Sequence, residues 1–218
     1  MPRVSEEYLA GKRKEITDAA HRVCLRKPVS MVTMTDIINE TGMAQGNIYR
    51  YYKDLDDIFS AMILDLRQSY SIIEETDSIF ENAGKEPVEV TMSKIFDMLA
   101  DKMEEQLMDI QKINFDLSVM AINDPERTAK IMSGLKSEGN LEHLVNRTVE
   151  LMGKAAATGE LHPRQPLEDI IKFLSSSYSG IQMNCIISAC YSQSPMAGYE
   201  PGKLFETLKQ TMLYLMGV

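Results

Sequence analysis

Residues 33–53, which read TMTDIINETGMAQGNIYRYYK, decide the fold of this chain. Thr33 is a good helix N-cap. Asp36 follows three residues later, where a carboxylate can bond back to the cap and face the positive end of the helix dipole. Gly42 comes where this first helix must end in a sharp turn, a position that favours a left-handed residue. The segment therefore predicts two short helices joined by a tight turn.

The second predicted helix, from about Ala44 to Tyr52, has two different faces. Spacing by four residues places Ala44, Ile48 and Tyr52 on one side, which suits a core. The opposite side carries amide, phenol and guanidinium groups, which suit base edges and phosphates of DNA. We interpret the pair as a helix-turn-helix DNA reader, although an ordinary helical hairpin has the same spacing. The polar residues of the second face are Gln45, Asn47, Tyr49 and Arg50.

The run DIINETGMAQGNIYRYYKDLDDIF, residues 36–59, resembles the N-terminal domain of the TetR family of bacterial repressors. The family pattern is D-I-A-x-x-A-G-V-S-x-G-x-L-Y-x-Y-F, followed by S-K-E-x-L. The upstream run ITDAAHRVCL, residues 16–25, also resembles the first helix of the family. The matching residues are Asp36, Ile37, Gly42, Gly46, Tyr49 and Tyr51, with Met43, Ile48 and Tyr52 as close replacements.

The resemblance implies an all-α chain of about nine to ten helices. An N-terminal three-helix helix-turn-helix domain would span residues 1–53, and a C-terminal helical ligand-binding and dimerisation domain would span residues 54–218. The implied function is a ligand-responsive transcriptional repressor that binds a near-palindromic double-stranded DNA operator as a homodimer. An unknown small-molecule effector would release it. The dimer would form through the last two helices, expected at about 167–191 and 201–216.

Two departures from the family pattern leave an alternative open. Ala44 stands where the family has a serine cap, and Leu55 stands where it has a lysine that contacts phosphate. We call the helix-turn-helix domain, residues 1–53, the head. The second hypothesis is therefore a helical protein-binding adaptor that keeps the head without sequence-specific DNA binding. Salt-dependent binding to duplex DNA would separate the two, because phosphate neutralisation releases counterions. The expected DNA contacts are Gln45, Asn47 and Arg50 with bases, and Thr33, Tyr49 and Lys53 with phosphates.

By analogy with the family, an effector pocket is expected between the middle helices of the C-terminal domain. The chain has 16 Met residues, and flexible thioether side chains line adaptable apolar sites well. Met and aromatic residues at helical spacing equally serve as plain core. The candidate lining residues are Phe96, Met103, Phe115, Met120, Tyr178 and Met183.

Charge is distributed unevenly along the chain. Residues 1–53 hold nine Lys and Arg and six Asp and Glu, a net charge of +3, which leaves 14 against 26, or −12, for the rest of the total of −9. A basic head on an acidic body fits a DNA-facing end with a separate regulatory body. The cations that could meet phosphates near the first helix are Arg3, Lys12, Arg13 and Lys14.

Helix boundaries are marked along the rest of the chain, and no strand alternation appears after Pro87. Asp54 should cap the helix after the head, whose apolar stripe extends from Ile58 to Ile73. Asp124, followed by a proline, should begin another helix, and a long helix should end near Gly159. The body is therefore predicted to be helical throughout.

An enzyme is the less favoured class. The sequence has no Gly-rich phosphate loop, no His-Glu-x-x-His and no Gly-x-Ser-x-Gly, so neither a catalytic site, a cofactor nor a metal is expected. The three Cys form no Cys-x-x-Cys pair, which favours a reducing cytoplasm. No apolar run approaches the roughly 20 residues of a membrane span, and no signal segment is recognised, so we expect a cytoplasmic protein without a membrane partner.

Overall fold

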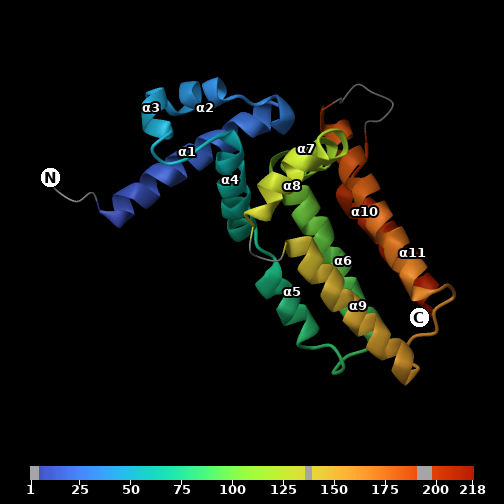
Figure 1. Ribbon diagram of the computed structural model, residues 1–218. Helices are drawn as coiled ribbons and strands as arrows, with labels where there is room; N and C mark the ends of the chain where they lie inside the picture. Colours follow the sequence, from blue (N-terminus) through green and yellow to red (C-terminus); the bar gives the residue numbers. More distant parts are fainter. Residues whose placement is uncertain (1–4, 136–138, 191–197) are drawn as a thin grey trace. The chain divides into compact units, whose positions relative to one another are not determined.

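The computed structural model describes residues 5–135, 139–190 and 198–218, and within these ranges the chain is all-α, as predicted (Figure 1). It has eleven α-helices there, slightly more than the predicted nine to ten, and its only β feature is an isolated bridge between Ala83 and Glu86. The helices are α1 (Glu6–Arg26), α2 (Met34–Thr41), α3 (Gln45–Ile48), α4 (Leu55–Ser69), α5 (Ile73–Phe80), α6 (Val88–Glu105), α7 (Lys112–Asn123), α8 (Pro125–Ser133), α9 (Asn140–Thr158), α10 (Leu167–Cys190) and α11 (Pro201–Met216).

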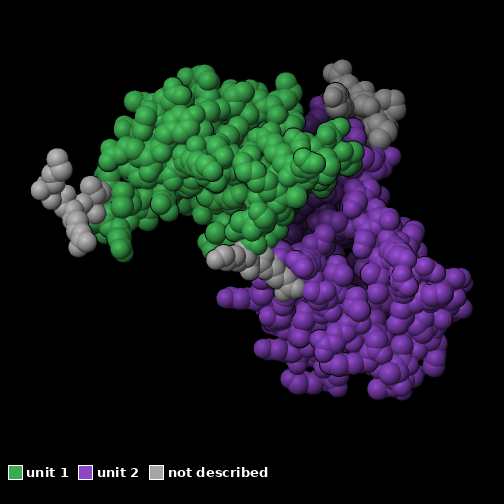
Figure 2. Space-filling model, in the orientation of Figure 1, with its two compact units in different colours: residues 1–70, 112–137 green, residues 71–111, 138–218 purple. Residues whose placement is uncertain are grey.

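The chain divides into two compact units, which Figure 2 colours separately. Unit 1 comprises residues 1–70 and 112–137, and therefore contains α1 to α4 together with α7 and α8. Unit 2 comprises residues 71–111 and 138–218, and contains α5, α6 and α9 to α11. The division at residue 53 stays a prediction about where DNA recognition ends, since α4, α7 and α8 pack within the same unit as the head.

Unit 1 is built around α1, which packs against α2 and α4. Because the consecutive alanines Ala19 and Ala20 are both completely buried, the neighbouring helices can approach α1 closely. Each of the four helices buries apolar side chains, and removing apolar surface from water is the main source of stability for a small helical domain. These fully buried residues include Ile16 of α1, Ile37 of α2, Ile48 of α3 and Phe59 of α4.

Polar contacts attach α8 to α4 inside unit 1. The Ser60 hydroxyl donates to the backbone carbonyl of Ile131 at 2.7 Å. The Asp56 carboxylate receives the Arg127 guanidinium at 2.9 Å and the Lys130 ammonium at 3.0 Å. Asp56 is the more buried partner in both ion pairs, and Lys130 also reaches Asp54 at 3.3 Å, so carboxylates at the start of α4 hold α8 together with the Ser60 bond.

Unit 2 has a core dominated by α6, which packs extensively against α11. The apolar residues of α6 follow helical spacing, and its large apolar side chains are buried. Methionine fills much of this core, where its flexible chain adapts to irregular gaps. Buried members of the core include Met92, Phe96 and Met103 of α6 with Phe205 and Met212 of α11.

Several helices begin or end at the capping residues and the glycine that the sequence predicts. Asp54 accepts from the backbone N–H of Asp57 at 2.9 Å, and Asp124 accepts from that of Arg127 at 3.1 Å. Gly159 ends α9 with a left-handed φ of 77°. The three predicted boundaries are therefore confirmed.

The helix after the head is shorter than its apolar stripe predicts. The stripe was expected to continue to Ile73, but α4 ends at Ser69 and Ile73 begins α5. The Ser71 hydroxyl accepts from the backbone N–H of Ile73 at 3.4 Å, a local bond that competes with continued helix. At the other end of the chain, α10 begins at Leu167 as predicted, and its expected last residue, Tyr191, lies outside the described residues.

The C-terminal end of α11 is fastened to the segment that precedes α10. The backbone N–H of His162 donates to the carbonyl of Met216 at 3.1 Å, and the Arg164 guanidinium stacks over the Tyr214 ring, 4.4 Å from its centroid. Gly217 has a φ of 77°, and a β-carbon at this position would overlap the backbone carbonyl of His162. The contact therefore requires glycine for both conformation and space.

Two glycines with the same φ provide a test of this contact. Replacing Gly159 with alanine should cost about 1 kcal/mol for the left-handed conformation alone, because its surroundings are open. Gly217→Ala should cost more, because α11 must also move away from His162. Equal free energies of unfolding for the two variants, measured by denaturant titration, would contradict a steric role for Gly217.

Candidate nucleic-acid interface and ligand cavity

The first helix of the helix-turn-helix begins with a reciprocal capping box. The backbone N–H and the hydroxyl of Thr33 each donate to Asp36 Oδ2 at 2.7 Å, while the Asp36 backbone N–H donates to Thr33 Oγ1 at 3.3 Å. The Lys27 ammonium reaches the same carboxylate oxygen at 2.7 Å. These bonds, that of Lys27 first, lower the pKa of Asp36 to about 2. Gly42 ends α2 at a φ of 67°, so both the predicted cap and the predicted turn are confirmed.

The second helix, α3, is shorter than predicted. It spans only Gln45–Ile48, and the chain then continues in tight turns, with the Tyr51 N–H donating to the Ile48 carbonyl at 2.9 Å. Ala44 offers no side-chain cap to its first turn, and Gly46 adds conformational entropy to its unfolded form. The predicted extension to Tyr52 is therefore wrong.

The two faces of this segment are only partly as predicted. Ile48 is completely buried and Tyr52 is half-buried. The Tyr52 hydroxyl donates to the backbone carbonyl of Arg13 in α1 at 3.4 Å. Ala44, which was expected on the same core face, is exposed. The predicted polar residues of the other face are all exposed: Gln45, Asn47, Tyr49 and Arg50.

The remaining two predicted DNA contacts lie at the ends of the motif. Lys53 is exposed, and its backbone N–H donates to the Asp57 carboxylate at 3.1 Å, which leaves its ammonium group free to reach outward. Thr33 is also exposed, but its hydroxyl is already bonded to Asp36. A phosphate at Thr33 would therefore have to compete with the capping box.

Ion pairing leaves three exposed cations of the head without a carboxylate. Among the residues that the structure describes, Arg13, Arg50 and Lys53 make no salt bridge, and the Tyr52–Arg13 bond brings α1 to the turn that carries the other two. Arg3 lies outside the described residues. The remaining cations of the head are paired: Lys12 with Glu15, Lys14 with Asp18, Arg22 and Arg26 with Glu40, and Lys27 with Asp36.

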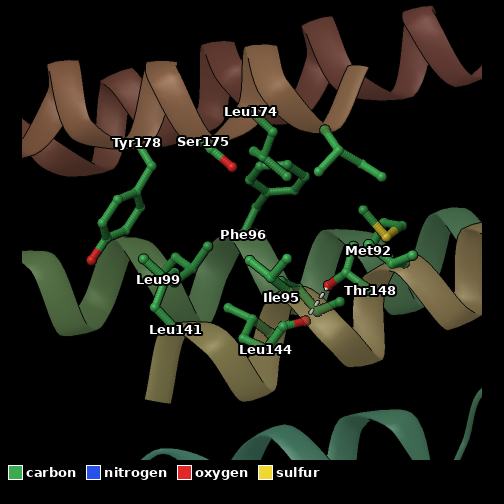
Figure 3. Close-up of a pocket in the computed structure, with 13 residues that line it drawn as sticks. Met92, Ile95, Phe96, Leu99, Leu141, Leu144, Thr148, Leu174, Ser175 and Tyr178 are labelled. Carbon is green, nitrogen blue, oxygen red and sulfur yellow. Dashed lines mark hydrogen bonds between the residues drawn. The ribbon is translucent and has the colours of Figure 1, made fainter. Parts of the chain in front are cut away.

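A cavity lies within unit 2 between α6, α9 and α10 (Figure 3). The cavity itself has a volume of about 50 Å³, and about 570 Å³ between these helices holds no protein atom when the space open to solvent is included. The figure shows Phe96 near the middle of the cavity and the Tyr178 ring at one end. The lining consists of Met92, Ile95, Phe96 and Leu99 of α6, Leu141, Leu144, Val145, Thr148 and Val149 of α9, and Ile171, Leu174, Ser175 and Tyr178 of α10.

The six residues proposed from the sequence as pocket lining are dispersed. Phe96 and Tyr178 line the cavity, Met103 belongs to the buried core of unit 2, and Met183 is exposed on α10. Phe115 and Met120 lie on α7 in unit 1.

Sequence reasoning did not identify the α9 wall of the cavity. Leu141, Leu144, Val145 and Thr148 follow one apolar stripe, which the sequence shows but which a fully packed helix would share. The signal for a cavity is that Leu141 and Val149 remain 47% and 43% exposed beside the fully packed part of the stripe, and this appears only in three dimensions.

Tyr178 is fixed at the end of the cavity by a buried amide pair. Its hydroxyl donates to Gln111 Oε1 at 3.3 Å, and the Gln182 amide donates to the same oxygen at 2.8 Å. Burial raises the pKa of Tyr178 to about 12, so the phenol stays neutral at physiological pH. Its ring also meets Phe205 edge to face, with centroids 6.1 Å apart.

A capped helix, a left-handed turn at Gly42 and a short second helix together form a helix-turn-helix motif. Residues 16–62 match the family described as bacterial regulatory proteins, tetR family. The chain is 26% identical over 185 residues to YfiR, an HTH-type transcriptional regulator of Bacillus subtilis (strain 168), and covers 85% of each chain. Residues 16–62 therefore match the tetR family of regulatory proteins, and over most of its length the chain is similar to an HTH-type transcriptional regulator.

Solved structures share this fold over nearly the whole chain. The fatty acid degradation regulator FadR from Bacillus halodurans has a TM-score of 0.66 at 14% identity, with 97% of both chains covered. FadR of Thermus thermophilus, a TetR family transcriptional repressor in complex with lauroyl-CoA, has a TM-score of 0.53 at 20% identity, covering 94% of this chain and 95% of that one. Among the described residues, no helix is both long enough and apolar enough to cross a membrane.

The capping box predicts a pH dependence that one substitution should shift. The folded pKa of Asp36, about 2, lies below its ordinary value of 3.8, so its stabilising effect is complete above about pH 4 and is lost as the pH falls towards 2. Lys27→Met should raise this pKa, which NMR titration measures, while the Thr33 bonds keep it below 3.8. Lys12→Met removes a cation paired elsewhere and should leave it unchanged. An unaltered pKa in Lys27→Met would assign the shift to the cap alone.

Proposed function

We propose that this regulator binds a near-palindromic operator through the α3 segment and represses transcription until a small molecule releases it. Gln45, Asn47 and Arg50 would contact base edges, because amide and guanidinium groups pair with adenine and guanine edges in the major groove. Tyr49, Lys53 and Thr33 would contact phosphates. The observation that carries the proposal is the exposed polar side chains of residues 45–50, beside cations that form no ion pair with any described carboxylate.

Arg13 extends the proposed contact surface beyond the residues chosen from sequence. Its guanidinium is exposed and makes no ion pair among the described residues, and its backbone is bonded to Tyr52. By contrast, Lys12 and Lys14 on either side of it are engaged with Glu15 and Asp18. Of the three consecutive basic residues, Arg13 is the one available to phosphate without breaking an existing pair.

The proposed dimer forms through α10 and α11. On α10, Phe173, Ser176, Gly180 and Met183 follow the spacing of one helix face, and Phe173 and Met183 are 47% and 38% exposed. A β-carbon at Gly180 would meet nothing within 4 Å, so this face can receive a partner helix closely. A twofold dimer presents two reading heads to successive turns of DNA, which explains the near-palindrome.

The proposed effector site is the cavity between α6, α9 and α10. FadR of Thermus thermophilus, which shares the fold, is a repressor that binds lauroyl-CoA. Its example supports both an effector and a repressing role for this chain. An effector that prefers the DNA-incompetent arrangement would release the operator by shifting the population of conformations.

The adaptor hypothesis retains one supporting observation. α3 is only four residues long and its N-cap residue, Ala44, makes no side-chain bond. Such a segment can be ordered by a protein surface as well as by DNA. Selection of duplexes from a random pool, followed by a salt titration, decides between them: a near-palindromic duplex bound with steep salt dependence supports the regulator, and no enrichment at low salt supports the adaptor.

Two substitutions should separate base recognition from phosphate contact. Arg50→Ala should weaken binding to the selected duplex by about 1–3 kcal/mol and affect random DNA much less, if Arg50 reads a guanine edge. Lys53→Ala should weaken both equally and reduce the salt slope by about 1. Lys14→Ala, which removes a paired cation, is the control. Equal losses on both duplexes for Arg50→Ala would reassign it to the backbone.

The dimer proposal predicts that a charge on the exposed face of α10 produces monomers. Phe173→Glu would place a carboxylate where a partner helix should pack, and burying it unpaired is costly. Sedimentation equilibrium should therefore shift from about twice the chain mass of 24.6 kDa towards the single chain. The neighbouring exposed substitution Lys172→Glu should leave the mass unchanged. A Phe173→Glu protein that remains dimeric would exclude this face as the interface.

A further inference from the structure

The cavity of unit 2 is lined almost entirely by hydrocarbon. None of its 13 lining residues carries a charge, and only Thr148, Ser175 and Tyr178 carry a polar side-chain atom. Figure 3 shows that these three hydroxyls come from two of the three surrounding helices, α9 and α10. A bound molecule would therefore meet only apolar side chains on the α6 side of the cavity.

Two of the three hydroxyls are already bonded within the protein. Thr148 donates to the Leu144 carbonyl of its own helix at 2.8 Å, and Tyr178 donates to Gln111. Figure 3 shows the Tyr178 hydroxyl directed away from Phe96 and Leu174, so the occupant would meet the ring of Tyr178. Ser175 is exposed and its hydroxyl makes no hydrogen bond to the residues that the structure describes. It is the one lining hydroxyl available to a ligand.

The helices around the cavity offer no free cation to an anionic ligand. α6, α9 and α10 together carry five Lys and Arg against nine Asp and Glu, a net charge of −4. Each of the five cations is paired with a carboxylate: Lys94 with Glu86, Lys102 with Glu75, Arg147 with Asp77, Lys154 with Glu150, and Lys172 with Glu168.

From these observations we infer that the cavity selects uncharged, largely apolar molecules whose single polar group lies at Ser175. The inference rests on the effector role proposed above and specifies the class of effector. A carboxylate or phosphate would have to break an ion pair or remain beside excess negative charge. A cation would find no carboxylate among the lining residues, and an unpaired ion costs far more to desolvate than a hydroxyl.

A matched series of compounds tests this class on the full-length protein. Isothermal titration calorimetry would compare 1-decanol, decanoate, decyltrimethylammonium and decanoyl-CoA, each of which has a ten-carbon chain that ends in a different head group. We expect 1-decanol to bind at least about tenfold more tightly than each charged compound. Ser175→Ala should weaken 1-decanol by about two- to tenfold, the worth of one hydrogen bond, without weakening decane.

A second pair of variants locates the binding. Val149 lines the cavity and is 43% exposed, so Val149→Trp can fill the space without displacing the buried core, and it should abolish binding of 1-decanol. Ala157→Trp, at an exposed position of the same helix away from the lining, should not. Retained binding in Val149→Trp would place the compound elsewhere and overturn the inference.

The outcomes separate this inference from the proposed function. Tighter binding of decanoate, decyltrimethylammonium or decanoyl-CoA, or equal binding of all four, overturns the uncharged class while an effector site in the cavity stands. Binding of none, by a protein that still binds its operator, overturns the inference and removes the cavity from the proposed function, leaving DNA recognition intact.

Discussion

The structure of the head depends on the hydrogen bonds that the Asp36 carboxylate accepts. It accepts from the backbone and hydroxyl of Thr33, which starts α2, and from Lys27, which follows the end of α1. Together with Glu40, which receives Arg22 and Arg26, it ties α2 to α1 through acidic residues facing basic ones. Because these acids of α2 are used to hold α1, they are not available to neutralise Arg50 or Lys53. The pairing that builds the motif thus also leaves Arg50 and Lys53 as exposed positive charges, in a chain whose net charge is −9.

Sequence reasoning succeeded where the deciding interaction spans only a few residues. The caps at Thr33, Asp54 and Asp124 and the left-handed turn at Gly42 depend on bonds within four residues, so their chemistry is visible in the sequence. The length of α3 and the end of α4 were missed because apolar spacing continues past both ends. Only Phe96 and Tyr178 of the proposed pocket residues line the cavity, since apolar stripes do not reveal which side chains leave space between helices.

Any release of DNA by an effector requires a link between the cavity and the head, and the backbone supplies one at Gln111 and Lys112. A kink at residues 107–111 interrupts regular helix here, with Asp109 at a φ of −119° and a ψ of −110°. Gln111 holds Tyr178 at the end of the cavity, whereas Lys112 donates to the Cys24 carbonyl in the last turn of α1 at 3.0 Å and pairs with Asp116. Gln111 is thus held within unit 2, and the next residue, Lys112, is held within unit 1.

The fold alone does not decide what occupies the cavity. FadR of Thermus thermophilus, solved in complex with lauroyl-CoA, is 20% identical to this chain. At this identity the backbone arrangement persists while most side chains differ. A thioester of coenzyme A needs cations for its phosphates. Here the cations of α6, α9 and α10 are engaged with carboxylates, and the lining offers one unbonded hydroxyl. The fold is therefore shared, whereas the charge balance around the cavity of this chain does not favour a head group as highly charged as coenzyme A.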